Sequence, residues 1–305
     1  MKQIYVKLRG RIGNQLFVYA FARQLQREYG EEAMIVIDDT EVLKVDWEDS
    51  LPYYDIKNIR FVHDEPIEKS IFSIKQRAVK GFFSTEAVGK NFMDKYAVEK
   101  KWQPRLNQNG IISCENGFID YKLNTRKNVF IEGYFQSEKY FKDAYEDIRY
   151  ELRPEQFKEI DTYPNIDKIR ERNTVCISIK VEHNVGNELY EVCDMKYWEK
   201  AIAYITEQVE NPLFFICSDN VDYVVNNLID TDHFDYVVQS KEYPVHVSLA
   251  VMNQCKHFII GNTTFGWWAQ YLADAPDKIV VAPSKWMLVD MPIDIYQEGW
   301  HLIEV

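Results

Sequence analysis

The sequence has few cysteines and no long apolar run, and both absences restrict what the chain can be. Its five cysteines are odd in number and scattered, without a CxxC pair, which excludes a disulfide framework or a structural zinc site and favours reduced thiols in a cytoplasmic protein. No stretch approaches the roughly 20 apolar residues that span a bilayer. The segment from Met1 to Leu8 also lacks the apolar run of an export signal.

Glycine and proline are scarce, and basic residues are fewer than acidic ones. Only 12 glycines and 10 prolines exclude a low-complexity chain. A net charge of −12, from 36 Lys and Arg against 48 Asp and Glu, argues against nucleic acid as a partner. With 46% apolar and 14% aromatic residues in 305 positions, the chain can bury the cores of two ordinary domains.

The second half of the chain alternates regularly between short apolar runs and helical patterns. The predicted strands are Val175–Val181, Leu213–Cys217, Tyr236–Gln239, His257–Ile260 and Lys278–Ala282. The predicted helices are Lys196–Gln208, Asn220–Leu228, His246–Cys255 and Thr263–Leu272. Strands that alternate with helices need crossover connections, which predicts a doubly wound parallel sheet.

The first half begins and ends in the same manner. Its predicted elements are the strands Gln3–Leu8, Ala33–Ile37 and Phe130–Phe135 and the helices Ile12–Tyr29 and Lys139–Leu152. The stretch 47–128 is less regular. The pattern predicts an α/β protein with two Rossmann-like domains, 1–155 and 156–305, joined near Pro154–Pro164 and separated by a cleft.

A basic segment runs from Lys69 to Arg105. It contains nine Lys and Arg against three acids, a net charge of +6, with apolar residues interleaved. An ordinary helix with a solvated basic face explains this pattern, and general priors favour that reading. The alternative is peripheral contact with anionic lipid at the inner face of a membrane, or with a lipid-linked pyrophosphate acceptor.

Three polar segments follow predicted strands. The first contains Arg9, Arg11, Gly13, Asn14 and Gln15. Glycines let the backbone turn tightly there, and the following helix N-terminus and the arginines favour an anionic ligand.

The other two segments lie in the second half. In one, Asn262 or Thr263 is a natural helix cap, and the hydroxyls of Thr263 and Thr264 suit phosphate oxygens. We expect Phe265 and Trp268 to pack inward, while the pair Trp267-Trp268 is also suited to a sugar- or base-binding wall. The remaining segment, Ser218-Asp219-Asn220, follows a strand. Because parallel strands place their ligands beyond their carboxyl ends, this segment, the Gly261 turn and the Lys180–Asn184 loop together predict a nucleotide-type site.

Several of these segments carry a family resemblance. Residues 13–20 (GNQLFVYA) resemble the GNQxFQYA motif of the α-1,2-fucosyltransferases of glycosyltransferase family eleven, and 132–141 (EGYFQSEKYF) resemble GYFQSxxYF. Residues 215–220 (FICSDN) are similar to FxxFSDD, 262–268 (NTTFGWW) to NSTFSWW, and 283–286 (PSKW) to PxxW. The order is preserved, and the matches extend over nearly the whole chain.

The resemblance implies a B-type glycosyltransferase that transfers a sugar with inversion, usually from GDP-fucose to a galactoside, without an essential metal or other cofactor. The first domain would face the glycan acceptor, and the second would bind the nucleotide sugar. The glycine turn, GxxGNQ rather than GxGxxG, makes a nicotinamide-dependent sugar-modifying enzyme a weaker alternative.

One family motif is altered. Where the family has HxRRGDY, this chain reads KVEHNVG at 180–186, so that Lys180 replaces the histidine, Glu182 and His183 replace the arginines and Val185 replaces the aspartate. Three explanations stay open. Lys180 with Arg9 and Arg11 supplies the missing positive charge, the donor or acceptor differs, or the protein binds without catalysis.

The residues predicted to contact the donor are Arg9, Arg11, Gly13, Asn14, Gln15, Lys180, Ser218, Asp219, Asn262, Thr263, Thr264 and Phe265. The candidates for a general base are Glu182, His183 and Asp219, by their position at strand ends alone, and a solvated loop is at least as good an explanation for Glu182 and His183. Asp38-Asp39 also ends a strand, and solvated carboxylates are the preferred interpretation there over a metal or acceptor site.

Overall fold

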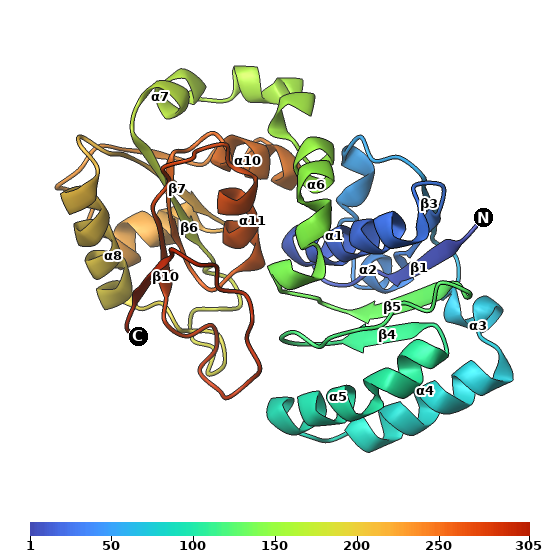
Figure 1. Ribbon diagram of the computed structural model, residues 1–305. Helices are drawn as coiled ribbons and strands as arrows, with labels where there is room; N and C mark the ends of the chain where they lie inside the picture. Colours follow the sequence, from blue (N-terminus) through green and yellow to red (C-terminus); the bar gives the residue numbers. More distant parts are fainter. The chain divides into compact units, whose positions relative to one another are not determined.

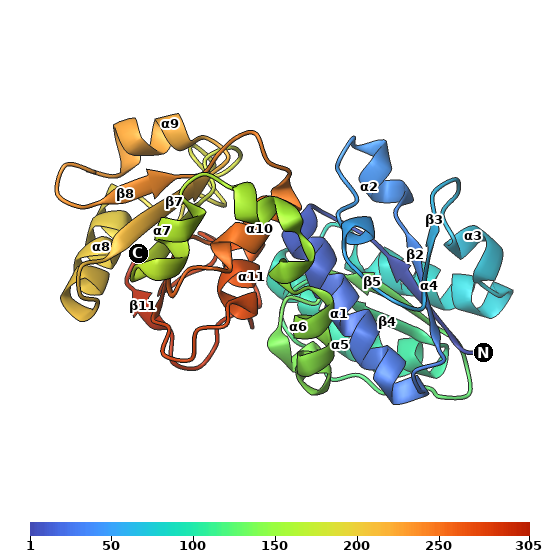
Figure 2. The same cartoon turned by 90° about the horizontal axis from the view of Figure 1, so that it is seen from above.

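The computed structural model describes residues 1–305, and the chain divides into two compact units (Figures 1 and 2). Unit 1 comprises Met1–Glu151 and Asp290–Tyr296, and unit 2 comprises Leu152–Val289 and Gln297–Val305. The sequence analysis placed the boundary at 155–156 and did not anticipate that 290–296 belong to the first unit. Each unit is built on its own parallel sheet.

Unit 1 has a five-stranded sheet in the order β3-β2-β1-β5-β4. Its strands are β1 (Gln3–Lys7), β2 (Met34–Asp38), β3 (Ile59–Val62), β4 (Ile111–Cys114) and β5 (Val129–Gly133). Its helices are α1 (Ile12–Tyr29), α2 (Thr40–Lys44), α3 (Glu68–Ile71), α4 (Ile74–Ala87), α5 (Phe92–Gln108) and α6 (Tyr145–Glu151). The short 3₁₀ turns are η1 (Leu51–Tyr53), η2 (Glu138–Tyr140) and η3 (Lys142–Ala144).

Helices cover both faces of this sheet. Figure 1 shows α1 and α6 on one face and α4 and α5 on the other. Helix α1 is buried almost throughout and ends at Gly30, whose φ of +106° closes the helix without the strain that a side chain would add there. On the opposite face, Phe72, Val79, Phe83 and Leu106 pack on the sheet in one apolar cluster. Each fully buried side chain of this size stabilises the fold by about 2 kcal/mol.

Unit 2 has a six-stranded sheet in the order β11-β10-β9-β6-β7-β8. Its strands are β6 (Thr174–Ile179), β7 (Leu213–Ser218), β8 (Tyr236–Val238), β9 (His257–Ile260), β10 (Val280–Pro283) and β11 (His301–Ile303). Its helical segments are η4 (Pro154–Gln156), η5 (Lys158–Thr162), α7 (Ile166–Glu171), α8 (Met195–Gln208), α9 (Val221–Tyr223), the π-helical η6 (Val224–Leu228), α10 (Val245–Met252) and α11 (Thr264–Leu272).

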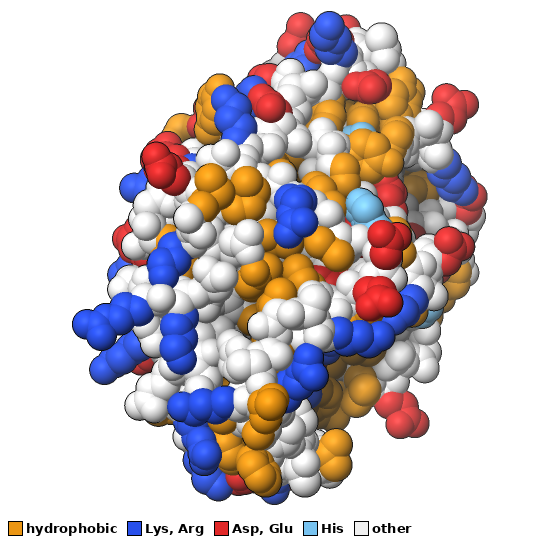
Figure 3. All heavy atoms as spheres, turned by 90° about the vertical axis from the view of Figure 1, so that its right-hand side faces the viewer, with side chains coloured by type: hydrophobic (Ala, Val, Ile, Leu, Met, Phe, Trp, Pro, Cys, Tyr) orange, Lys and Arg blue, Asp and Glu red, His pale blue; other side chains and the backbone are white.

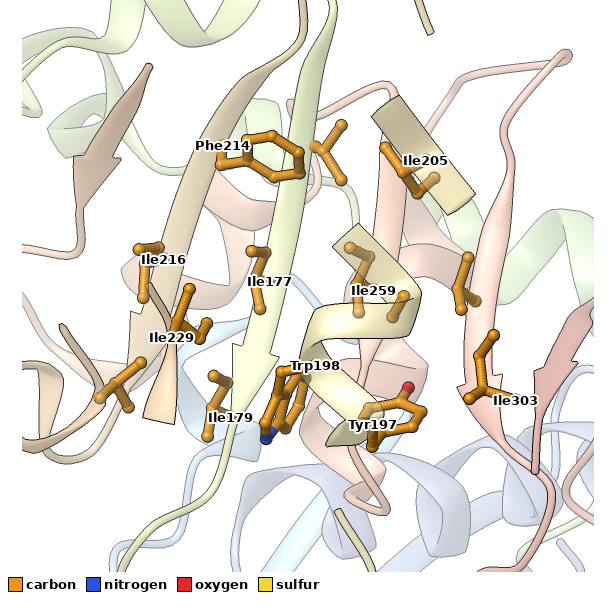
Figure 4. Packing of buried hydrophobic residues seen from close by; sticks show 14 of the residues in the cluster. Ile177, Ile179, Tyr197, Trp198, Ile205, Phe214, Ile216, Ile229, Ile259 and Ile303 are labelled. Carbon is orange, nitrogen blue, oxygen red and sulfur yellow. The ribbon is translucent and has the colours of Figure 1, made fainter. Parts of the chain in front are cut away.

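The central strands of unit 2 are buried on both faces. Every residue of β6 and β7 is buried, which explains their continuous apolar runs. Figure 4 shows Tyr197, Trp198 and Ile205 of α8 packed on the side chains of the sheet, while α10 and α11 cover the other face (Figure 1). This layered arrangement confirms the predicted doubly wound parallel sheet.

Three local expectations differ in part from the structure. The stretch 47–128 is regular: it contains β3, α3, α4, α5 and β4. A helix was expected only for the basic segment from Lys69 to Arg105, and its division was obscured because α4 and α5 bury only a narrow stripe and α5 contains Pro104. The predicted helix Lys139–Leu152 is two 3₁₀ turns followed by α6, and the predicted helix Asn220–Leu228 continues after one α-turn as a π-helix.

None of the helices in either unit combines the length and the hydropathy needed to cross a lipid bilayer.

Candidate functional site

Polar residues gather beyond the carboxyl ends of three neighbouring strands of unit 2. The central strand β6 pairs with β9 on one side and with β7 on the other. Lys180 follows β6, Asp219 follows β7, and the turn from Gly261 to Thr264 follows β9. The order in which successive strands are added reverses between β6 and β9, because β7 and β8 lie on one side of β6 and β9 to β11 on the other. Such a switch point is where open α/β sheets bind ligands.

Asp219 holds the start of the loop that follows β6. One carboxylate oxygen accepts the backbone N–H groups of Val181 at 2.8 Å and Glu182 at 3.4 Å, and the other pairs with the ammonium of Lys180. The positive charge of Lys180 is therefore already balanced within the unit. Asp219 positions the loop, an arrangement that gives this carboxylate a structural role.

The side chains of Glu182 and His183 are exposed, and His183 adopts a φ of +68°. They lie on the same loop, directly after the two residues that Asp219 holds. Their carboxylate and imidazole occupy the positions where the family motif has arginines.

The β9–α11 turn is fixed by its own side chains. Asn262 is buried, and its amide donates to the carbonyls of Tyr190 at 3.1 Å and Trp286 at 3.0 Å. Thr263 is the N-cap of α11, and its hydroxyl accepts the Gly266 N–H at 3.1 Å. The side chains of Asn262 and Thr263 thus build the turn, while the half-buried Thr264 and Phe265 follow at the first turn of α11.

Phe265 stays partly exposed, whereas Trp267 and Trp268 are both fully buried. The two indoles pack edge to face at 5.0 Å and contact Tyr271. A wall of tryptophans for a sugar or base is excluded, because neither ring reaches the surface. Phe265 was expected to pack inward, and it does so only in part.

Trp198 also lies at this candidate site, and the sequence analysis did not name it. Its indole N–H is buried and has no hydrogen-bond partner, and the side chain lines a small cavity of about 20 Å³ together with Lys180, Gly261 and Asn262. Figure 4 shows this indole beside Ile179, at the carboxyl end of β6. A buried donor without a partner is rare and is available for a ligand at the switch point. In the sequence, Trp198 is indistinguishable from any other apolar residue of an amphipathic helix.

In unit 1, the turn between β1 and α1 is built around Gln15. The buried amide of Gln15 donates to the carbonyls of Gly10 at 2.9 Å and Glu48 at 2.8 Å and accepts the N–H of Ser50 at 2.8 Å. The Asn14 side chain accepts the Gln136 amide at 2.9 Å. Gln15 therefore holds the segment around Ser50 against the turn. Gly13 is buried within the first turn of α1.

Arg9 and Arg11 have different surroundings. Arg9 forms ion pairs with Glu115 at 3.0 Å and Glu132 at 3.2 Å, so its charge is balanced within unit 1. Arg11 is exposed, and its guanidinium lies 5.9 Å from the ring centre of Trp47. Of these two arginines, Arg11 carries the charge that is open to an anionic ligand.

Asp38 and Asp39 are buried, each only 1% exposed, so the expected solvated strand end is wrong. Asp38 accepts the hydroxyl of Thr40 at 2.6 Å and the N–H of Ile67 at 2.7 Å. Asp39 contacts His63, the first residue after β3, at 2.6 Å. A sequence pattern could not reveal this contact, because β3 was not predicted as a strand.

Comparison with known proteins places these features in a family. The model of glycosyl transferase family 11 matches residues 108–304. The O-antigen biosynthesis glycosyltransferase WbnK of Escherichia coli is 26% identical over 97% of this chain and 99% of its own length. The α-1,2-colitosyltransferase of Escherichia coli is 23% identical over 94% of this chain and 93% of its own.

The fold is similar to that of a solved fucosyltransferase. NodZ from Bradyrhizobium superposes with a TM-score of 0.54 at 14% identity, over 96% of this chain and 100% of that chain. At that identity the likeness concerns the fold alone, and it agrees with the predicted pair of Rossmann-like α/β units. Because the family model covers well over half of the sequence, the chain belongs to glycosyl transferase family 11 and is a glycosyltransferase.

Proposed function

We propose that this protein transfers fucose from GDP-fucose to the 2-hydroxyl of a galactoside in a surface glycan, with inversion at the sugar carbon. Its relatives support the choice of chemistry. One full-length relative is named an α-1,2-colitosyltransferase, and the rat galactoside α-(1,2)-fucosyltransferase 1 is 34% identical over 27% of this chain and 22% of its own. A NodZ structure of similar fold, with a TM-score of 0.52, was co-crystallised with GDP.

The observation that carries the proposal is the switch point of unit 2. There, Trp198, whose indole N–H has no partner, lines a cavity with Gly261 and Asn262, the two residues that precede the N-cap of α11. Free N–H groups and the positive end of a helix dipole favour a phosphate-bearing ligand. We therefore assign the nucleotide sugar to unit 2 and the glycan acceptor to unit 1.

The proposed reaction is a single displacement. The acceptor oxygen loses its proton and forms a bond to C1 of the fucose, while the bond from C1 to the diphosphate oxygen breaks and its electron pair leaves with GDP. Donors that face the diphosphate stabilise this departure. We assign this role to the α11 N-terminus, with the hydroxyls of Thr263 and Thr264, and to Lys180.

A second donor sugar is the alternative that one observation favours. In this chain Glu182 and His183 stand where the family motif has arginines, and the charge of Lys180 is balanced by Asp219. A relative that is named for colitose transfer shows that family members differ in the sugar they carry. A donor with another 6-deoxy sugar on the same nucleotide therefore belongs in the test.

The test is a transfer assay with the purified full chain. The protein is incubated with a β-galactoside and GDP-fucose, GDP-colitose, GDP-mannose or UDP-galactose, and the product is identified by mass spectrometry and NMR. The expected result is an α-1,2-linked product from a GDP-6-deoxy sugar. The matched control is the same galactoside without its 2-hydroxyl, which should give no product. Binding of GDP without transfer from any donor would instead indicate a homologue that has lost catalysis.

We also propose that the basic segment from Lys69 to Arg105 contacts an anionic membrane surface. Lys and Arg side chains gather on the lower part of the face in Figure 3, where α3 and α4 lie. Between these charges, Ile74 is 88% and Phe82 64% exposed. Exposed apolar side chains with surrounding cations are the combination that binds a lipid interface.

Liposome flotation tests this contact. The protein should float with vesicles of phosphatidylcholine and phosphatidylglycerol at low salt, and a variant with Lys100, Lys101 and Arg105 changed to glutamate should not. The control is a vesicle of phosphatidylcholine alone. Equal flotation of both proteins would contradict the proposal.

A further inference from the structure

Unit 1 contains a histidine–aspartate pair at the carboxyl edge of its sheet. His63 directly follows β3 and Asp39 directly follows β2, and these strands are parallel neighbours with Asp38 opposite Val62. The imidazole Nδ1 lies 2.6 Å from a carboxylate oxygen of Asp39. The aspartate is 1% exposed, whereas the His63 side chain is 56% exposed. The buried Asp39 carboxylate therefore holds Nδ1 of the imidazole, and Nε2 faces solvent.

A second carboxyl group stabilises this arrangement. Asp49 forms a hydrogen bond with Asp39, which requires that one of the two carry a proton. Burial, and then the neighbouring Asp39, raise the pKa of Asp49 to about 7. The buried oxygens Asp39 Oδ1 and Asp49 Oδ2 have no hydrogen-bond donor from another residue, which is consistent with one shared proton.

The family motif around Gln15 positions this cluster. Gln15 holds the carbonyl of Glu48 and the N–H of Ser50, the two residues on either side of Asp49. Asp49 in turn accepts the Leu51 N–H at 3.2 Å. Gln15 thus fixes the backbone on both sides of Asp49, whose carboxyl bonds to Asp39, and Asp39 in turn contacts His63. This gives Gln15 a role in unit 1 that is separate from contact with a nucleotide sugar.

The surroundings of the pair suit a carbohydrate. The same segment that carries Asp49 also exposes Trp47 and Tyr53. Arg11 lies over the ring of Trp47, and Phe61 lies parallel to the imidazole of His63 at 6.0 Å. Flat aromatic faces bury the apolar faces of sugar rings while their polar edges stay hydrated.

We propose that His63 is the general base that takes the proton from the acceptor hydroxyl, and that Asp39 is the residue that positions its imidazole. This inference rests on the proposed glycosyl transfer. With Nδ1–H donated to Asp39, Nε2 holds the lone pair that accepts the proton. The acceptor O–H bond breaks, its oxygen forms the bond to C1, and GDP leaves with the electron pair. The imidazolium afterwards gives its proton to water.

The other base candidates lack this arrangement. The Asp219 carboxylate is occupied by Lys180 and two backbone N–H groups. Glu182 and His183 are exposed on a loop, and no buried carboxylate forms a hydrogen bond with the His183 ring. A base that is oriented by a third group is the more effective geometry, because it fixes both the tautomer and the direction of the lone pair.

The experiment compares the wild type with His63→Asn, whose amide can still donate to Asp39 but cannot take a proton. We expect kcat for sugar transfer to fall by at least about 100-fold, with the Kd for GDP and the circular dichroism spectrum unchanged. The matched control is His233→Asn, because His233 is an exposed histidine of unit 2 that also lies near a carboxylate. Added imidazole should restore part of the activity of His63→Ala.

The outcomes distinguish failure of the proposed general base from failure of the proposed glycosyl transfer. Wild-type protein that transfers no sugar from any donor overturns the proposed function, and the base with it. Wild-type protein that transfers sugar, with His63→Asn within threefold of it, overturns the base alone. A fall in kcat for His63→Asn that is matched by His233→Asn also overturns it. If His63→Ala is poorly folded, His63→Asn alone decides the question.

Discussion

Glu132, on β5, is surrounded by three cations, and its replacement by glutamine should destabilise unit 1 strongly. Its side chain is only 12% exposed and contacts Lys7 at 3.0 Å, Lys80 at 2.7 Å and Arg9 at 3.2 Å. Burial alone would raise the pKa of this carboxyl, but Lys80, Lys7 and Arg9 hold it at about 2. A carboxyl whose pKa lies about 2.5 units below its ordinary value contributes about 3 kcal/mol to folding at neutral pH.

The sign of the pH dependence follows from the same shift. Because the pKa of Glu132 is lower in the folded than in the unfolded state, its contribution is complete above about pH 4.5 and is lost as the pH falls towards 2. Urea denaturation followed by circular dichroism should show that Glu132→Gln loses about 3 kcal/mol at pH 7 and much less near pH 2. Glu159→Gln, at an exposed glutamate, is the control. A loss below about 0.5 kcal/mol at pH 7 would refute the reasoning.

Three further changes test separate parts of the structure. Glu99 is 1% exposed, and burial, opposed by the Glu115 N–H, raises its pKa to about 7, so that its ionisation destabilises the fold as the pH rises from about 4.5 to 7. Glu99→Gln should therefore raise the unfolding free energy at pH 8, and an unchanged unfolding free energy at that pH would contradict the prediction. Thr263→Ala removes the α11 cap and should cost about 1 kcal/mol in a urea titration, with an unchanged midpoint as the contrary result. Trp198→Phe keeps the packing but removes the indole N–H, so calorimetry should show that the affinity for GDP falls about 10-fold. The control Trp102→Phe, in unit 1, should leave the affinity unchanged, and equal affinities of Trp198→Phe and the wild type would exclude Trp198 from the site.

The parallel sheets were predictable because their central strands are buried on both faces. In β6 and β7, continuous apolar runs separated by helical patterns leave little choice of fold. For the segment from Lys69 to Arg105 the sequence indicated helix but not its division into α4 and α5, because each buries a narrow stripe and their polar surfaces dominate the pattern. The return of 290–296 to unit 1 depends on tertiary contacts such as that of Ser137 and Asp294 at 2.6 Å, which leave no periodic signal in the sequence.

The site was predictable where glycine turns follow strands and not where it depends on side-chain partners. Position alone indicated Asp219 and Thr263. In the structure, Asp219 binds Lys180 and the backbone N–H groups of residues 181 and 182, and Thr263 caps a helix. The sequence indicated neither Trp198 nor His63. Trp198 resembles a core residue of a helix, and His63 follows a strand that the pattern did not predict. Their roles depend on burial and on a neighbour distant in the sequence.

The most direct test of the central claim is calorimetric titration of the purified full chain with GDP, UDP, dTDP and CMP in the absence of metal. The account predicts micromolar binding of GDP to one site per chain, clearly tighter than that of the other nucleotides. Preference for another nucleotide would contradict the proposed donor, and absence of binding to all four would contradict the assignment of the unit 2 switch point as a nucleotide-sugar site.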